Sequence, residues 1–200
     1  MKHTLFERME ANIYPVVIPR VLPDKQYKQL QEEINILTNW NLSNKSVKTG
    51  GRSWAPPICD KQNPYLFYLS TIINLKLQKI IKKRLRLCRI HINGQTAGQP
   101  SEFHIDYDFD NVWTFILFSD VEWDTEWGGE FVCQNPVTKK YSYVEFKPNS
   151  GVLIPSNWSH RGTSPLPCTD NLRMTVAFSY CTRENFDILL KKVPTNVFWK

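Results

Sequence analysis

The chain has 200 residues, of which 42% are hydrophobic and 22% are charged, and its formal net charge is +6. This length and composition indicate one globular domain and exclude a largely disordered chain. The longest uncharged apolar stretch, residues 112–118, is far shorter than the ~20 residues of a membrane helix, so we expect no membrane partner. Charges at residues 2, 7, 8 and 10 are not typical of a secretory signal.

The cysteines are odd in number, scattered, and contain no C-x-x-C motif. This pattern argues against a disulfide scaffold or a zinc–thiolate site and favours a reducing, cytoplasmic compartment. The five positions are Cys59, Cys88, Cys133, Cys168 and Cys181.

Most of the positive excess lies in residues 79–86. We expect this run to form the solvated face of a helix, which makes nucleic acid an unlikely partner.

Two helices and a long loop are predicted for the N-terminal part of the chain. The first helix has Asp24 as its N-cap, and its apolar side chains recur at helical spacing at Tyr27, Leu30, Ile34 and Leu37. Residues 41–62 are rich in Asn, Ser, Gly and Pro and predict a loop, either a substrate lid or a plain connection. The second helix begins with Asn63 as cap and Pro64 at its first position, and extends to Ile81.

Short β-rich runs follow from residue 88, separated by Gly, Pro, Asn and Asp. They are 88–93, 101–106, 112–119, 129–133, 141–147, 151–154 and 172–181. Such a series predicts a sandwich, jelly roll or barrel with helices on its flank. We therefore expect one domain over residues 1–200: helical support and loop at 1–87, a jelly-roll core at 88–182, and a C-terminal extension at 183–200.

The first chemical candidate is His104-Ile105-Asp106. Residues two apart on a strand share a face, so His104 and Asp106 make two-thirds of a facial metal triad. His160, which follows an apolar strand and a turn, would complete two imidazoles and one carboxylate, the ligand set of non-haem Fe(II) oxygenases. On spacing alone, a surface-turn histidine is the favoured interpretation of His160.

Arg173 begins the last β-rich run. Alternate residues from Leu172 form an apolar face, whereas Arg173, Thr175, Ala177 and Ser179 form a small polar face with one cation. If that face points inward, the arginine needs an anionic partner, and a dicarboxylate co-substrate would supply one.

Several motifs occur together in a specific order. They are His104-Ile-Asp106, Trp127-Gly-Gly-Glu-Phe131, Lys147-Pro-Asn-Ser-Gly151-Val-Leu-Ile-Pro, His160 and Arg173-Met-Thr175. From about residue 89 to 180 the chain thereby resembles the 2-oxoglutarate- and Fe(II)-dependent dioxygenases, in the prolyl 4-hydroxylase-like branch. The resemblance implies a mainly β fold with flanking helices: a double-stranded β-helix core, also called a jelly-roll or cupin-like core, behind N-terminal helices.

The same resemblance assigns the site residues. His104, Asp106 and His160 match the Fe(II) ligands, and Arg173 matches the basic residue that pairs with the 5-carboxylate of 2-oxoglutarate. Thr175 stands where serine is common beside that arginine. O2 is the second co-substrate, and ascorbate is the expected reductant.

Two further positions are carried over as co-substrate contacts. Thr114 lies where family members place a hydroxyl near 2-oxoglutarate. His91, in His91-Ile-Asn-Gly94-Gln95, occupies the place of a tyrosine that usually contacts the co-substrate. The alternative for His91 is a half-buried strand histidine with no role in binding.

The implied reaction is hydroxylation of an unactivated C–H bond, with release of succinate and CO2. Asp106 favours hydroxylation over halogenation, which needs a small residue there. The resemblance favours a prolyl residue of a peptide or protein as substrate. The alternatives are a free amino acid or other small molecule, or a jelly-roll module that binds without catalysis.

Aromatic side chains near the expected rim of the site are either substrate contacts or core residues, since large aromatics usually lie in the core. They are Trp54, Tyr107, Phe109, Trp113, Trp123 and Trp127.

Overall fold

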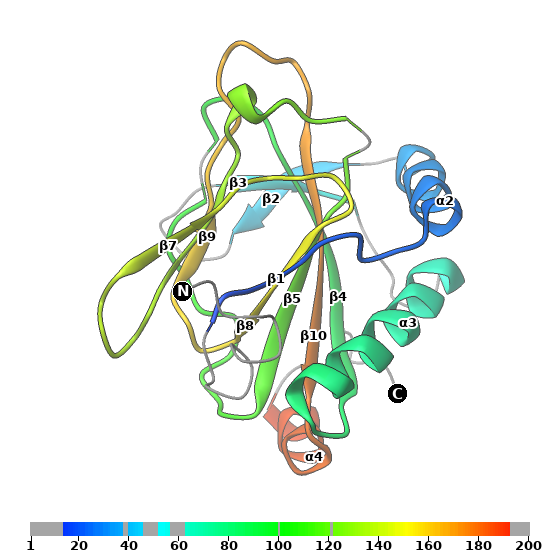
Figure 1. Cartoon of the computed structure of the whole chain (residues 1–200), viewed down its shortest axis with the longest axis vertical. Helices are drawn as coiled ribbons and strands as arrows, with labels where there is room; N and C mark the ends of the chain where they lie inside the picture. Colours follow the sequence, from blue (N-terminus) through cyan, green and yellow to red (C-terminus); the bar gives the residue numbers. More distant parts are fainter. Residues whose placement is uncertain are drawn as a thin grey trace.

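The computed structural model describes residues 14–37, 40–45, 52–56, 63–99, 101–120 and 122–192, without the side chains of residues 43–45, 52 and 190–192. Its strands are β1 (Val16–Ile18), β2 (Asn41–Lys45), β3 (Arg52–Ala55), β4 (Arg86–Gln95), β5 (Val112–Phe118), β6 (Phe131–Gln134), β7 (Tyr141–Val144), β8 (Gly151–Pro155), β9 (His160–Gly162) and β10 (Arg173–Cys181). They form a larger antiparallel sheet, in the order β1-β8-β5-β10-β4-β3-β2, and a smaller one, in the order β7-β6-β9 (Figure 1).

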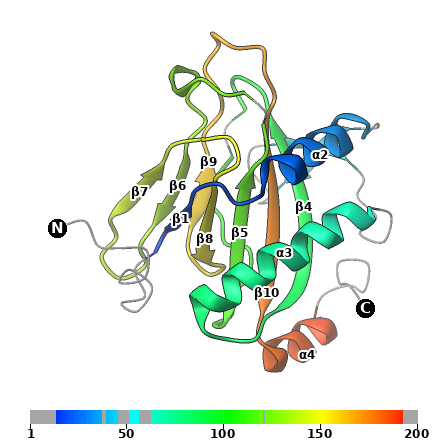
Figure 2. The ribbon, with the colours of Figure 1, turned by 45° about the vertical axis from the view of Figure 1, so that its right-hand side comes forward.

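The helices are α2 (Asp24–Asn35), α3 (Pro64–Ile81) and α4 (Arg183–Lys192), with a short 3-10 helix at Thr125–Trp127. Figure 2 shows α2 and α3 against one face of the larger sheet, while the smaller sheet lies on the other side. The part of the chain that the structure describes holds no helix long and apolar enough to cross a membrane.

Local sequence signals account for the start of α3. The side chain of Asn63 accepts a hydrogen bond from the backbone N–H of Leu66, at 3.0 Å, and Pro64 is the first helical residue, as predicted. The predicted cap of α2 is wrong: Pro23 precedes that helix, and Asp24 lies in its first turn. There its carboxylate still interacts favourably with the positive end of the helix dipole.

The central strand β5 is buried along its whole length because both of its faces are covered. Phe115 and Leu117 pack in the core between the larger sheet and the helices, whereas Ile116 and Phe118 pack in the core between the two sheets. Burying one such side chain contributes about 1.5–3 kcal/mol. The continuous apolar run of the sequence is therefore a strand sandwiched between two cores.

The alternation predicted for β10 is confirmed. Val176 and Phe178 belong to the core beneath the helices. Arg173, Thr175, Ala177 and Ser179 line a cavity on the opposite face. The polar face of the last strand therefore points into the molecule.

Two segments differ from the sequence-based expectation. Residues 41–62 contain β2 and β3, and β3 joins the larger sheet through the pairing of Trp54 with Gly94. Pairing with an existing sheet edge stabilises a polar segment that has no strand signal of its own. The rest of the predicted lid, including Gly50 and Gly51, lies outside the described residues. The predicted strand 101–106 is reduced to one bridge, between His104 and His160.

The basic run 79–86 does not form one helical face. Helix α3 ends at Ile81, Lys82 adopts a left-handed conformation with φ of 57°, and Arg86 begins β4. Its charges are therefore spread over a helix end, a connection and a strand.

Candidate active site

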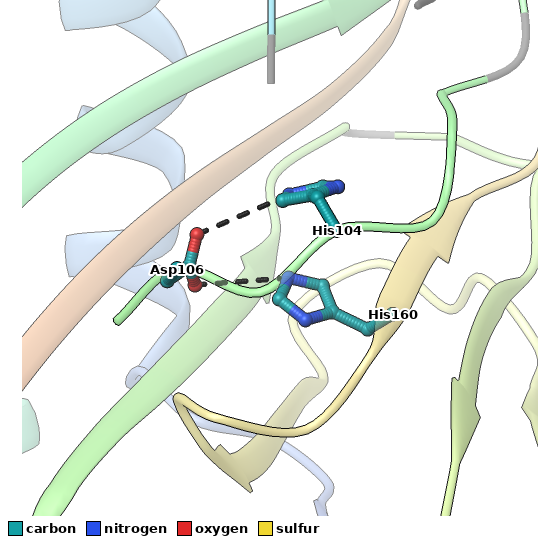
Figure 3. Close-up of side chains that lie close together, drawn as sticks. All are labelled: His104, Asp106 and His160. Carbon is teal, nitrogen blue, oxygen red and sulfur yellow. Dashed lines mark ion pairs between the residues drawn. The ribbon is translucent and has the colours of Figure 1, made fainter. Parts of the chain in front are cut away.

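Figure 3 shows three side chains that converge: His104 and Asp106 from the connection between β4 and β5, and His160 from the start of β9. The Nε2 atom of His104 lies 3.9 Å from Oδ1 of Asp106, and Nε2 of His160 lies 3.6 Å from Oδ2. The two histidines exchange backbone hydrogen bonds of 3.0 and 2.9 Å, which holds their rings 4.5 Å apart. A single backbone bridge thus fixes two residues that are distant in sequence.

Both imidazoles are oriented by hydrogen bonds to the main chain. Nδ1 of His104 lies 2.9 Å from the carbonyl oxygen of Glu102, and Nδ1 of His160 lies 2.9 Å from that of Trp158. Because a carbonyl oxygen only accepts, each Nδ1 carries a proton, and in the neutral imidazole this leaves the lone pair on Nε2. The lone pairs face Asp106, as metal-binding histidines require.

Asp106 is held by a chain of hydroxyl groups. The hydroxyl of Thr114 donates to Oδ2 of Asp106 at 2.6 Å, and it lies 2.9 Å from the hydroxyl of Ser156. Since the proton of Thr114 goes to the carboxylate, Ser156 is the donor in the second bond. Burial raises the pKa of Asp106, but His160, Thr114 and His104 together lower it below its ordinary value. Asp106 is therefore ionised at neutral pH.

The protonation states suit a divalent cation. Burial is the largest effect on His160 and lowers its pKa, so its imidazole is neutral at neutral pH. Ligands about 2.1 Å from an ion and at right angles are about 3 Å apart. The observed separations of 3.6 and 3.9 Å require only small side-chain rotations. Two imidazoles and one carboxylate fit Fe(II) in a facial triad.

The triad lines a cavity of about 190 Å³ between the two sheets. All four predicted co-substrate residues, Arg173, Thr175, His91 and Thr114, line the same cavity. The structure therefore brings every sequence-predicted site residue to one place.

Arg173 is buried at 3% exposure, which is unusual for a cation. Its Nε donates to the carbonyl oxygen of Gly129, its Nη1 donates to Oε1 of Gln95 at 2.8 Å, and its guanidinium lies 4.8 Å from the ring centre of Phe146. Burial lowers the pKa of Arg173 to about 10, which leaves it charged at neutral pH. No carboxylate within the described ranges forms an ion pair with it, so a bound carboxylate would be well matched.

Two glycines make room for Arg173. A Cβ atom at Gly129, whose φ is 79°, would lie 3.0 Å from Cδ of Arg173, and one at Gly162 would lie 2.9 Å from its Nη1. The Trp127-Gly-Gly-Glu-Phe131 motif thus supplies both a left-handed turn and space for the buried guanidinium.

The other two candidates have different surroundings. His91 pairs with Ala177 across β4 and β10, and burial, the largest effect, lowers its pKa to about 4, so it is neutral at neutral pH. The proton of Thr114 is engaged with Asp106, so this residue orients a triad member.

The six aromatic residues expected at the rim do not line this cavity. Tyr107 and Trp113 are buried in hydrophobic clusters, and Trp123 packs edge-on against Trp127. The aromatic side chain that does line the cavity is Phe131.

Sequence reasoning did not single out Ser156, Gln95 or Arg89, although Ser156 orients the triad through Thr114 and the other two line the cavity. For the residues on β4, the sequence signal that could have found them is the alternation of polar and apolar side chains. Arg89, His91, Asn93 and Gln95 alternate with buried apolar residues along that strand.

Comparison with known proteins gives structural relatives only: no family model and no curated protein matches the sequence. A 2OG-Fe(II) oxygenase family oxidoreductase from Burkholderia pseudomallei matches with a TM-score of 0.71 and 11% identity, over 90% of this chain and 92% of that chain. A Trichoplax adhaerens prolyl hydroxylase, in complex with a hypoxia inducible factor peptide fragment, matches with a TM-score of 0.69 and 13% identity, over 92% and 90%.

A third relative is HygX from Streptomyces hygroscopicus with nickel, 2-oxoglutarate and hygromycin B bound. It matches with a TM-score of 0.63 and 14% identity, over 84% of this chain and 83% of that chain. The chain therefore has the jelly-roll fold of the 2-oxoglutarate/Fe(II) oxygenases, and the fold class predicted from sequence is confirmed. Within that fold lies a His-Asp-His group that could hold a metal ion.

Proposed function

We propose that this protein is a 2-oxoglutarate- and Fe(II)-dependent dioxygenase that hydroxylates an unactivated C–H bond. The observation that carries the proposal is the convergence of two histidine Nε2 atoms and one carboxylate in a cavity that also holds a buried arginine. Bound Fe(II) would supply O2 activation, coupled to decarboxylation of 2-oxoglutarate to succinate and CO2.

His104, Asp106 and His160 are the proposed metal ligands, with their Nε2 and carboxylate oxygen atoms as donors. Arg173 pairs with the 5-carboxylate of 2-oxoglutarate, since its guanidinium is desolvated and has no carboxylate partner in the described part of the chain. Thr175 follows it on the same strand face and adds a hydroxyl beside this carboxylate.

His91 and Thr114 have supporting roles in the proposal. His91 is neutral, so a ring nitrogen can hydrogen-bond the co-substrate without adding charge. Thr114 orients Asp106 and keeps its carboxylate ionised. Ascorbate serves as the reductant that keeps iron in its Fe(II) state.

A prolyl residue of a peptide or protein is the substrate that we favour. The ordered motifs resemble the prolyl 4-hydroxylase-like branch, and a prolyl hydroxylase is among the structural relatives. A free amino acid or another small molecule is the second candidate, because the HygX structure holds hygromycin B and the cavity of this chain is lined mainly by polar side chains.

Metal binding and turnover test the proposal together. The protein, reconstituted with Fe(II), ascorbate and 2-oxoglutarate, is incubated with prolyl peptides and free amino acids, and succinate is measured. Asp106→Ala should weaken Fe(II) binding at least about 100-fold, because a ligand contributes more than the orienting groups around it. Asp108→Ala, an exposed acidic residue two positions away, is the matched control.

Equal Fe(II) affinity in the Asp106→Ala and Asp108→Ala proteins would refute the metal site and favour a non-catalytic binding module. Tight Fe(II) binding without succinate release in any reaction would refute the dioxygenase activity.

A further inference from the structure

The cavity contains a second arginine, Arg89, which has no role in the proposed reaction. Arg89 lies on β4 and lines the cavity together with the triad. Unlike that of Arg173, its guanidinium forms neither an ion pair nor a hydrogen bond with any residue that the structure describes. A guanidinium directed into a polar cavity without a partner is a ready binding group for an anion.

Strand pairing places Arg89 at the level of the triad. Arg89 pairs with Ser179 of β10, and Ser179 pairs with Thr114 of β5, whose hydroxyl binds Asp106. Arg173 lies six residues before Ser179 on the same strand face, a distance of about 20 Å at 3.3–3.4 Å per residue. The two arginines therefore come from backbone positions at opposite ends of the cavity.

One co-substrate molecule does not serve both arginines in the proposed reaction. 2-Oxoglutarate has two carboxylates, of which one pairs with Arg173 and the other is directed to the metal. Neither is left for Arg89. The position beside the triad is therefore open to a different anion.

The charges of the cavity lead to the same conclusion. Its acidic and basic side chains, apart from the histidines, are Arg89, Arg173 and Asp106, and a metal-bound imidazole is neutral. Adding a divalent metal ion and the 2-oxoglutarate dianion leaves one positive charge uncompensated. A monoanionic ligand that pairs with this charge would therefore be preferred over a neutral one.

Arg89 lines the same cavity as the three members of the triad. A substrate anion beside the triad would thus lie within the reach of this guanidinium.

We propose that Arg89 binds a carboxylate of the substrate and thereby places the carbon to be oxidised beside the metal. The inference deepens the proposed function and rests on it. It defines the substrate class as acids: the carboxylate belongs either to a free amino acid or to a peptide, as an acidic side chain or C-terminus next to the target residue. A neutral amide of the same shape leaves the guanidinium unpaired and is rejected.

The first test measures binding without turnover. Protein loaded with Mn(II) and 2-oxoglutarate under argon is titrated with acetate or with acetamide, and relaxation of the probe's carbon nuclei by Mn(II) reports occupancy near the triad. Acetate should bind at least about 10-fold more tightly than acetamide in the unmodified protein, as expected for a charge-assisted pair. The preference should disappear in Arg89→Gln and be partly retained in Arg89→Lys.

Arg84→Gln is the matched control, because it removes the same charge from an exposed position in the connection before β4. Equal acetate affinity in Arg89→Gln and the unmodified protein, or no preference for acetate at all, would overturn the inference. Mn(II) and 2-oxoglutarate binding are measured beforehand. If they fail, the proposed function fails, and the acetate titration of the metal-free protein by calorimetry still tests Arg89.

The second test identifies the source of the carboxylate. Succinate release is compared between free L-amino acids and their amides, and between acetyl-Pro-Asp-amide and acetyl-Pro-Asn-amide. Acids should be used in preference to amides. Arg89→Gln should lower kcat/KM for the acid about 10–100-fold, the effect of one lost charge-assisted hydrogen bond, and leave the KM for 2-oxoglutarate unchanged. Equal use of amides and acids would contradict a carboxylate subsite.

Discussion

Replacing Thr114 with valine removes one hydroxyl while keeping the shape of a buried side chain. That hydroxyl donates to Oδ2 of Asp106 at 2.6 Å and accepts from Ser156. A hydrogen bond to a charged group contributes about 1.5–3 kcal/mol, and losing this one raises the pKa of Asp106. The orienting contact of a metal ligand is lost as well, and we expect metal affinity to fall about 10–100-fold.

Mn(II) binding followed by electron paramagnetic resonance measures this effect. The proton competes with the metal for Asp106, so a higher pKa also moves the midpoint of metal loss on acidification to higher pH. Thr169→Val, which removes a buried hydroxyl outside the cavity, should change neither quantity. Metal affinity within twofold of the unmodified protein, with an unshifted midpoint, would refute the role of Thr114.

Three further substitutions test the packing and the charges around the site. Burial raises the pKa of Asp120 to about 7. The folded state therefore retains a proton that the unfolded state loses near pH 4, and stability falls as the pH rises from about 4 to about 7. Asp120→Asn should raise the free energy of unfolding by up to about 4 kcal/mol at pH 8 and by little at pH 4, measured by urea denaturation; equal effects at both pH values would contradict this. Gly151→Ala places a Cβ atom against the ring of Phe115 and should lower the melting temperature, at a cost of about 1–3 kcal/mol. Adding Phe115→Leu should recover part of that loss, and no recovery would exclude the ring contact as the cause. Gly129→Ala strains a residue with φ of 79° and crowds the side chain of Arg173. Calorimetry should therefore show at least about 10-fold weaker 2-oxoglutarate binding, with metal affinity retained. Unchanged 2-oxoglutarate binding would show that the added methyl group does not displace the guanidinium of Arg173.

Local signals predicted the elements whose stability is local. Asn63 and Pro64 mark the start of α3 because a side-chain cap and a fixed φ act within one turn. The alternation along β10 predicted its inward face because successive side chains point to opposite sides. By contrast, β2 and β3 carry no apolar pattern, and they become strands by pairing at the edge of the larger sheet.

The residues of the site differ in how they could be predicted from the sequence. His104 and Asp106 follow from spacing along the chain, whereas His160 could be selected only through resemblance to a family, since nothing local distinguishes it from a surface histidine. Arg89 was not identified from the sequence because β4 shows the alternation of polar and apolar residues that is common in strands. The sequence does not reveal which polar side chains share one cavity.

The sequence by itself determined the class of fold, the identity of the candidate ligands and the alternation that makes one face of β10 polar. Only the tertiary structure decided that both histidines present Nε2 to Asp106 and that Thr114 orients a carboxylate. It also decided that two arginines enter one cavity. The physical reason is that capping and alternation depend on neighbours along the chain, whereas protonation, burial and charge balance depend on groups that meet only when the two sheets face each other.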